Sequence, residues 1–361
     1  MKRIILSLYD KLTEYRISFP RLIDSRTEFR LKRNFLDCRK LSGERNKIAK
    51  DYWGGCYKYL NTKYINSYNT YNQVFDPRYL PDDFYYSKVD TYYNSAVACE
   101  ALDDKNLYNL YFNDVNQPTT FIRRCNGLWM DRDYQIIPLS EVRLFLESLP
   151  IKSLIIKKTQ LSEGGRNIFF WNREQGFDYL IKLFNNDQSD LIAQEIILQH
   201  EQLSKLHPSS VNTIRMLTFT ANTMSKVLSA IVRIGANGSR VDNGHSGGCF
   251  CGINDEGRLK EFGYNWFTGE RYDKHPTTEA IFSDSVIPNF DKCKALVEKI
   301  SPRLASFSRL TSWDLSIRDD GTPVLIEVNL CYGGLFFHQI ANGPIFGDNT
   351  KDIVKEILKL S

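Results

Sequence analysis

Three oxygen-bearing side chains, Asp314, Glu327 and Asn329, occur on two consecutive stretches that have the pattern of β-strands. Strands are predicted over 310–318 and 323–329. Polar and apolar residues alternate in 312–317 of the first, Glu327 and Asn329 flank Val328 in the second, and the Asp-Gly step between the strands is typical of a hairpin turn. Residues two apart on a strand share a face, and hairpin strands lie about 5 Å apart, so the three side chains can converge. Mg²⁺ accepts such oxygens beside nucleotide phosphates. The pattern predicts a magnesium site, with a solvated sheet face as the other interpretation.

A lysine at the end of another strand-like stretch is a candidate phosphate ligand. Residues 154–157 have the apolar pattern of a buried strand ending in Lys157, and Gly164 and Gly165 follow in a short polar segment. Glycines let backbone N–H groups approach a phosphate, and a nearby lysine neutralises its charge. The spacing is not that of a Walker A loop. An ordinary hairpin turn is the alternative, so this motif has weight only together with the others.

A serine-hydrolase motif competes with this interpretation, because residues 244–248 read Gly-His-Ser-Gly-Gly. A nucleophile at Ser246 would need a strand before it and a helix directly after it. The following residues, 249–253, instead have a strand pattern, and no downstream acid and histidine form a recognisable triad. We therefore treat the hydrolase as the minor alternative.

The cysteines and histidines form no metal-binding pattern. None of the eight cysteines belongs to a C-x-x-C pair, and no two of the five histidines lie four residues apart. We therefore predict free thiols.

Helices and strands alternate along the chain that must position these residues. A length of 361 residues exceeds one average domain, so we expect two or three lobes. Turns and short helices are expected over 51–95. Longer helices are predicted over 98–112, 141–149 and 290–307, and further strands over 120–124, 154–158, 191–197, 213–220, 227–234 and 249–253.

The charge is concentrated at the N-terminus. The whole chain has a net charge of +4, while residues 1–50 contain 14 Lys and Arg against 6 Asp and Glu. The spacing of Ile4, Ile5, Leu8 and Leu12 predicts a basic amphipathic helix, which either packs on its own protein or contacts an anionic membrane surface. The acidic remainder argues against nucleic-acid binding. No apolar run is long enough for a membrane span or signal peptide, so we expect a cytoplasmic protein, for which peripheral contact at the inner face of the membrane is the alternative to a helix packed on its own protein.

In their order and spacing, these motifs resemble the ATP-grasp ligases. Lys105 opens a helix, Lys157 ends a strand before a Gly-rich loop, and the oxygen-bearing hairpin is near the end of the chain. The chain is most similar to the branch associated with sugar transfer and polysaccharide gene clusters, over roughly residues 70–345. The segments that carry this similarity are Gln194–His200, Asn212–Arg215, Val241–Asn243, Gly247–Gly248 and Ile326–Asn329.

The resemblance implies an α+β ATP-grasp fold, in which two α+β lobes grip ATP after a mostly helical N-terminal segment. Residues 1–95 would form that basic, Tyr-rich segment and help to bind substrate. Residues 96–190 would form the first lobe with its Gly-rich loop. Residues 191–361 would form the second lobe, with the magnesium site and a C-terminal helix.

The resemblance also implies a role for each matching residue. ATP would be held by residues of both lobes: its phosphates by Lys105, Lys157, Gly164 and Gly165, its adenine by Gln194, Glu195 and Ile196, and its ribose by Glu201 or Gln202. The reacting phosphoryl group would be lined by Arg215, Arg233 and Asn243, and two Mg²⁺ ions, for which Mn²⁺ can substitute, would be held by Asp314, Glu327 and Asn329.

The implied reaction is ATP-dependent amide formation through an acyl phosphate, with release of ADP and phosphate. The expected substrates are a small carboxylate and an amine or a nucleotide- or lipid-linked sugar. A sugar acid or amino sugar would be joined to an amino acid or another amine in capsule or O-antigen biosynthesis. The sequence departs from the family pattern in three places: Lys158 follows Lys157 where proline is usual, the loop at 164–167 reads Gly-Gly-Arg-Asn where Gly-Lys-Gly is commoner, and residues 1–70 match no named segment. The alternative is an ATP-grasp module that binds nucleotide or glycan without turnover, against which the complete Asp-Glu-Asn set argues.

Overall fold

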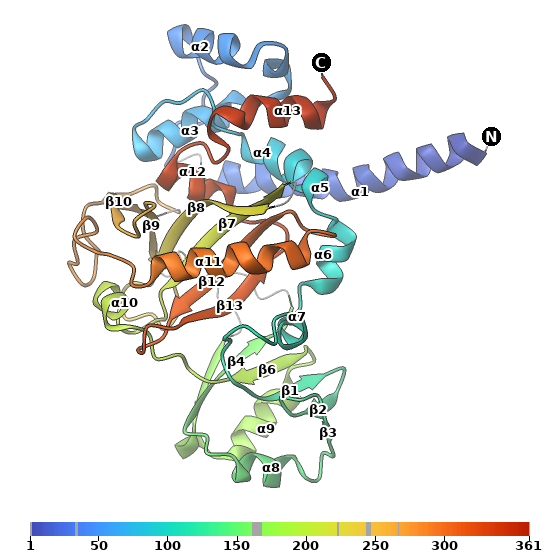
Figure 1. The fold of residues 1–361 in the computed structure, drawn as a ribbon, viewed down its shortest axis with the longest axis vertical. Helices are drawn as coiled ribbons and strands as arrows, with labels where there is room; N and C mark the ends of the chain where they lie inside the picture. Colours follow the sequence, from blue (N-terminus) through green and yellow to red (C-terminus); the bar gives the residue numbers. More distant parts are fainter. Residues whose placement is uncertain are drawn as a thin grey trace.

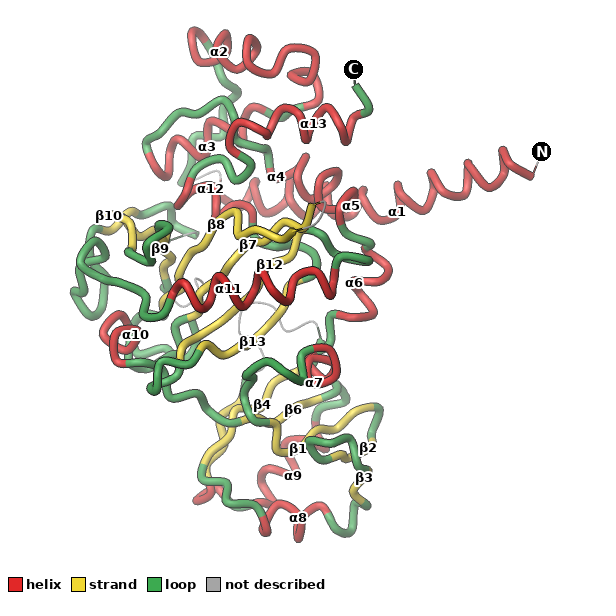
Figure 2. Tube along the Cα trace, in the orientation of Figure 1, coloured by secondary structure: helices red, strands yellow, loops and turns green. Residues whose placement is uncertain are grey.

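The computed structural model describes residues 2–32, 35–160, 168–221, 224–242, 247–265 and 267–360. Both ends of the chain form a helical layer, a large antiparallel sheet lies in the middle, and a smaller antiparallel sheet lies at the far end (Figure 1). The strands are confined to the lower two layers, while helices make up most of the first (Figure 2). The chain is therefore built as two sheets with a helical layer on the larger one.

The smaller sheet forms the first α+β lobe, with the strand order β3-β2-β1-β6-β4-β5. Helices α8 (Val142–Ser148) and α9 (Phe177–Asn186) share its hydrophobic core. On α9, Phe177, Leu180 and Phe184 recur at helical spacing and are all buried, which is why this helix packs on the sheet. The strands are β1 (Thr120–Cys125), β2 (Leu128–Met130), β3 (Ile136–Ile137), β4 (Ser153–Lys158), β5 (Phe169–Asn172) and β6 (Leu191–Gln194).

The larger sheet forms the second lobe, with the order β11-β10-β9-β8-β7-β12-β13. Helix α11 (Phe290–Ile300) packs on one face of this sheet and α12 (Leu335–Asn342) on the other. The buried residues of the two helices belong to two separate hydrophobic cores. A short helix, α10 (Glu201–Leu206), precedes the sheet. The strands are β7 (Thr213–Ala221), β8 (Met224–Ile234), β9 (Cys249–Ile253), β10 (Leu259–Tyr264), β11 (Arg271–Tyr272), β12 (Leu310–Ile317) and β13 (Pro323–Asn329).

The helical layer is continuous with the second lobe, because both share one core. Tyr68 stacks on Tyr79, both contribute to the core that contains Phe336 and Ile340 of α12, and the Gln339 side chain bonds the backbone of Leu80. The helices of this layer are α1 (Lys2–Leu31), α2 (Gly43–Trp53), α3 (Thr62–Asn72), α4 (Asp82–Phe84), α5 (Asp90–Tyr93), α6 (Ala96–Leu102) and α13 (Thr350–Leu358). Single turns, including η3 (Tyr85–Val89), connect several of them, and η4 (Lys105–Leu107) and α7 (Tyr108–Tyr111) lead from the layer to the first lobe.

The predicted α+β class and the C-terminal hairpin are confirmed, but three predicted elements are too long. The helix expected over 98–112 is interrupted, because the Asp104 side chain accepts the N–H of Asn106 and starts a new turn. The strand expected over 191–197 ends at Gln194. The helix expected over 290–307 is α-helical only to residue 300, just before Pro302.

The predicted lobe division at 190/191 falls before β6, although β6 pairs with β1 and β4 of the smaller sheet. The chain passes to the larger sheet between Gln194 and Thr213. All eight cysteines are free, as predicted. Among the described helices, none combines the length and the apolar character needed to cross a bilayer.

Candidate active site

Two lysines from the side of the first lobe face strand β13. The N–H of Lys105 donates to the carbonyl of Thr159 just beyond β4, at 3.0 Å, and its ammonium lies 2.7 Å from Glu327 Oε1. Lys157, in β4, is buried and lies near enough to both Lys105 and Glu327 for their charges to shift its pKa. The two predicted phosphate ligands therefore meet a predicted metal ligand where the lobes join.

The hairpin places the three predicted metal ligands on one face. Asp314 and Glu327 are direct cross-strand partners, and Asn329 pairs with Ser312 one step further along. The side chain of Asp314 is 1% exposed, whereas that of Glu327 is 28% exposed. Asp314 is thus the buried end of the set, which rules out a solvated sheet face there.

Two arginines of the neighbouring strands surround Asp314. Arg215 on β7 donates from Nε and Nη2 to the two carboxylate oxygens, at 2.7 and 2.6 Å. Arg233 on β8 lies 3.5 Å from Asp314 Oδ2 and 3.0 Å from Asp242 Oδ2, and its Nε donates to Thr213 Oγ1 at 2.9 Å. Both predicted phosphoryl-binding arginines are therefore part of one buried charge network.

Burial and neighbouring charge shift the pKa values of this site. Burial lowers the pKa of Lys157 to about 8, and the charge of Lys105 acts in the same direction. Burial alone would raise the pKa of Asp314, but Arg215 and Arg233 hold it lower, at about 2. Within the part of the chain that the structure describes, Lys157 has no ion-pair partner. A buried cation of this kind is suited to an anionic ligand.

The predicted adenine contacts lie on the segment between the lobes. The carboxylate of Glu195 accepts the N–H of Thr119 at 2.7 Å and pairs with the Arg318 guanidinium, and although burial opposes them, these contacts lower its pKa. Gln194 is buried at the end of β6. The backbone N–H and C=O of Ile196 make no hydrogen bond to described residues, so both are available to a ligand.

The two candidate ribose ligands lie at the start of α10. Glu201 pairs with Lys205 at 2.7 Å and its side chain is 79% exposed. Gln202 is exposed, and its N–H donates to His200 Nδ1 at 3.2 Å. These contacts leave the ribose role of either residue as a prediction.

Three of the predicted site residues, Gly164, Gly165 and Asn243, lie outside the described residues, as does Ser246 of the hydrolase motif. The elements around Ser246 are described, and strand β9 begins at Cys249. A strand therefore follows this motif where a nucleophile elbow requires a helix.

The described residues fit a divalent cation. Glu327 has one carboxylate oxygen free of the Lys105 contact, and the buried Nδ2 atom of Asn329 has no hydrogen-bond partner, so the amide can turn its oxygen to the site. Within the described ranges, no three His, Cys, Asp or Glu side chains form a metal cluster, as expected for two carboxylates and an amide.

Arg318 is a site residue that was not predicted, although the sequence contains a signal for it. Residue 318 is four beyond Asp314 at the end of the same alternating stretch, so a strand that extends this far places both on one face. Its partner Glu195 is distant in sequence, and only the fold brings the two together.

In a comparison with protein families, residues 180–355 match the family described as sugar-transfer associated ATP-grasp. Residues 180–355 belong to that ATP-grasp family. The match includes Arg215, Arg233 and the whole β12–β13 hairpin, and the two-lobed ATP-grasp fold predicted from the sequence is confirmed. A search among curated proteins gives no match.

Several solved structures are distantly similar to this chain. D-cycloserine synthetase DcsG shares 16% identity at a TM-score of 0.39, with 71% of each chain covered. The ligase PsnB, complexed with a precursor variant, Mg and ADP, shares 14% identity at 0.40, covering 74% of this chain and 62% of PsnB. D-alanyl-alanine synthetase A from Vibrio cholerae shares 11% at 0.41, with 72% and 66% covered. This chain therefore spans under two thirds of the latter two.

Proposed function

We propose that this protein is an ATP-dependent carboxylate–amine ligase. The observation that carries the proposal is the convergence of Lys105 and Lys157 on Glu327, beside a buried Asp314 that two arginines hold ionised. Such a group of cations and carboxylates suits the transfer of a phosphoryl group, whose charge must be neutralised in the transition state. A purely structural sheet contact would not need a buried lysine without an ion-pair partner.

Each group of residues would bind a different part of ATP or of the substrate. ATP would lie between the lobes, with its phosphates against Lys105 and Lys157 and its adenine against the backbone of Ile196. Mg²⁺ held by Asp314, Glu327 and Asn329 would neutralise phosphate charge when bound. Arg215 and Arg233 would orient the γ-phosphate and the substrate carboxylate.

The reaction proceeds in two transfers. A carboxylate oxygen of the substrate attacks the γ-phosphorus, and the bond to ADP breaks, which gives an acyl phosphate and ADP. The amine then attacks the acyl carbon, phosphate leaves, and the amine loses a proton. No covalent intermediate with the protein is needed, so the cationic residues act by binding and orientation.

We propose a sugar acid or amino sugar as one substrate and an amino acid or small amine as the other, in the biosynthesis of a surface polysaccharide. The support is the description of the matched family, sugar-transfer associated ATP-grasp. A sugar acid or amino sugar that is linked to a nucleotide or a lipid would present the same carboxylate or amino group to the site.

Incubation with ATP, Mg²⁺ and pooled uronic acids and amines tests the activity. We expect ADP and phosphate, with one ¹⁸O per amide transferred from the labelled carboxylate to phosphate. AMP, or unlabelled phosphate beside an amide, would contradict the mechanism. If ADP binds but no pool supports turnover, the non-catalytic module is favoured.

Glu327→Gln, which keeps the size of the side chain and removes its charge, tests the proposed metal site. We expect ATP turnover to fall at least about a hundredfold, because an amide cannot supply the charge of the carboxylate to bound cations. The circular dichroism spectrum, which should match that of the wild type, controls for folding, since the loss of the charge beside the buried Lys105 is itself expected to lower the melting temperature. Turnover within about threefold of the wild type would exclude the assigned metal site.

A further inference from the structure

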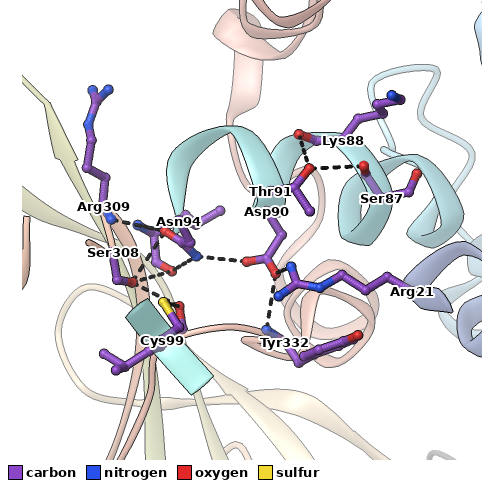
Figure 3. Close-up of polar contacts among 12 residues, drawn as sticks. Arg21, Ser87, Lys88, Asp90, Thr91, Asn94, Cys99, Ser308, Arg309 and Tyr332 are labelled. Carbon is purple, nitrogen blue, oxygen red and sulfur yellow. Dashed lines mark hydrogen bonds and ion pairs between the residues drawn. The ribbon is translucent and has the colours of Figure 1, made fainter. Parts of the chain in front are cut away.

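A buried polar network links α1 to the segment that follows the proposed metal ligand Asn329 (Figure 3). Arg21 of α1 and Asp90 of α5 are both buried, and Nη1 of the arginine lies 2.5 Å from Oδ2 of the aspartate. The same aspartate oxygen accepts the backbone N–H of Tyr332 at 3.4 Å. Tyr332 is three residues beyond Asn329. Two contacts, Arg21–Asp90 and Asp90–Tyr332, therefore connect the N-terminal helix to the segment that directly follows Asn329.

The Tyr332 side chain is held by the same helix. The Arg21 guanidinium lies 4.6 Å from the centroid of the Tyr332 ring, and Tyr86 stacks on this ring at 5.5 Å. The backbone of Tyr332 has φ +56°, a left-handed conformation that is uncommon and costly for a bulky non-glycine residue. The contacts with Arg21, Asp90 and Tyr86 help to hold Tyr332 in this conformation.

The other side of the network reaches the strands themselves. Asp90 Oδ1 accepts from Asn94 Nδ2 at 2.8 Å, and the Asn94 amide bonds both the N–H and the C=O of Leu310, the first residue of β12. Ser308 Oγ donates to the carbonyl of Leu330 at 2.9 Å. The network therefore joins the start of the strand that carries Asp314 to the segment after β13.

The segment 330–334 in turn borders the proposed phosphoryl site. Ser312 Oγ donates to the carbonyl of Gly333 at 2.8 Å. At Gly334, which has φ +79°, an added Cβ would lie 3.4 Å from Arg215 Nη1. A shift of this segment would therefore displace groups beside Arg215 as well as Asn329.

We propose that Arg21 is a positioning residue of the active site, which acts through Asp90 and Tyr332 to hold the segment 330–334 and hence Asn329. The inference rests on the proposed function of the site. Arg21 lies outside the matched residues 180–355, so the N-terminal layer would supply a part of the site that the family segment does not contain. Small displacements of positioning groups are costly to phosphoryl transfer.

Arg21→Met tests the proposal, with Arg26→Met as its matched control. Arg26 is on the same helix and also pairs with a buried carboxylate, Asp83, at 3.2 Å, but the described contacts of this pair do not include the segment 330–334. Hydrogen exchange of the peptide that covers 330–334 reports the positioning without any ligand. Binding of ADP with and without Mg²⁺, by calorimetry, reports its effect on the site.

For Arg21→Met we expect exchange in 330–334 to quicken at least tenfold and the Mg²⁺-dependent gain in ADP affinity to fall about tenfold. For Arg26→Met, the exchange rate of 330–334 and the Mg²⁺-dependent gain in ADP affinity should both stay within twofold of the wild type. Arg21→Lys, which keeps the positive charge, should retain most of the exchange protection. If Arg21→Met does not fold, Tyr332→Leu keeps the ion pair, removes the ring contacts and should give the same two changes. Equal exchange and equal ADP binding in the Arg21 and Arg26 variants would overturn the proposal. Wild-type protein without Mg²⁺-dependent ADP binding would overturn the proposed function instead, and the exchange comparison would still decide the positioning.

Discussion

Lys157 is the residue at which function and stability conflict. Its ammonium is buried beside Lys105, and the resulting fall of its pKa from 10.5 to about 8 means that folding disfavours the charged form. The contribution of Lys157 to the free energy of unfolding therefore rises as the pH increases from about 8 to 10.5. At neutral pH, where the buried lysine is charged, the contribution is unfavourable. An anionic ligand would remove this penalty.

Lys157→Met should stabilise the ligand-free protein by about 1 to 3 kcal/mol at pH 7, because an apolar side chain replaces an uncompensated buried charge. The same variant should bind ADP at least tenfold more weakly. Urea unfolding and calorimetry measure the two effects. A loss of stability comparable to the loss of affinity would instead mean that the lysine is structural.

Proton uptake on nucleotide binding follows from the same shift. With a free pKa of about 8, Lys157 is mostly neutral at about pH 8.5, and phosphate binding should raise its pKa, so that roughly half a proton or more is taken up. At pH 7 the lysine is already charged, and uptake should be near zero. Calorimetry in buffers of different ionisation enthalpy measures this difference. Lys157→Arg, which stays charged, should abolish the uptake at pH 8.5.

Helix α1 buries several polar side chains and exposes some apolar ones. Its buried positions include Ser18, Arg21 and Ser25, whereas Phe19 and Ile23, one turn apart, are 42% and 44% exposed. Ser18, Arg21 and Ser25 thus face the protein while Phe19 and Ile23 face outward, although Phe29 of the same helix packs against the core beside Tyr64. Exposed apolar residues on a basic segment are typical of helices that lie on anionic membranes, so the membrane-contact alternative for this helix can be tested.

The double variant Phe19→Ser/Ile23→Ser should bind vesicles containing anionic lipid roughly tenfold more weakly than the wild type, since two apolar contacts of about 1 kcal/mol each are lost. Flotation with the vesicles measures this binding. Leu144→Ser on α8, where the leucine is 70% exposed, is the control and should change nothing. Absence of wild-type binding to anionic vesicles would contradict the membrane prediction.

At the scale of the whole molecule, the two lobes are connected by charge pairs across the proposed ATP site. Lys105–Glu327 and Arg318–Glu195 are such pairs. A third pair, Arg303–Asp114, joins helix η8 (Ser301–Leu304) to the segment before β1 on the outer surface. Only the first two involve residues with proposed roles in nucleotide binding.

Arg318→Met should therefore weaken ADP binding about tenfold, because Glu195 loses the partner that orients it beside Ile196. Arg303→Met breaks the outer pair and should leave ADP affinity within twofold. Calorimetric titration compares the two. Similar affinities would indicate that the Arg318–Glu195 pair has no part in placing the adenine.

The hairpin 310–329 could be predicted from the sequence because its information is local. Alternation and an Asp-Gly turn determine which residues share a face, and they brought Asp314 and Glu327 into direct pairing. The same local logic failed at 98–112, where α6 ends at Leu102 and the Asp104 side chain starts a new turn, although the apolar spacing alone would have continued the helix.

Strand length, lobe boundaries and charge pairing were decided only by the tertiary structure. Residues 191–197 have a strand pattern throughout, but β6 ends at Gln194 because Glu195 bonds Thr119 and Arg318 instead. Likewise, no spacing in the sequence connects Arg21 with Asp90 or Lys105 with Glu327. Periodicity determines which face of a single element a residue occupies. The environment of a buried charge depends on elements far apart in the sequence, such as Arg21 with Asp90 and Lys105 with Glu327, which only packing brings together.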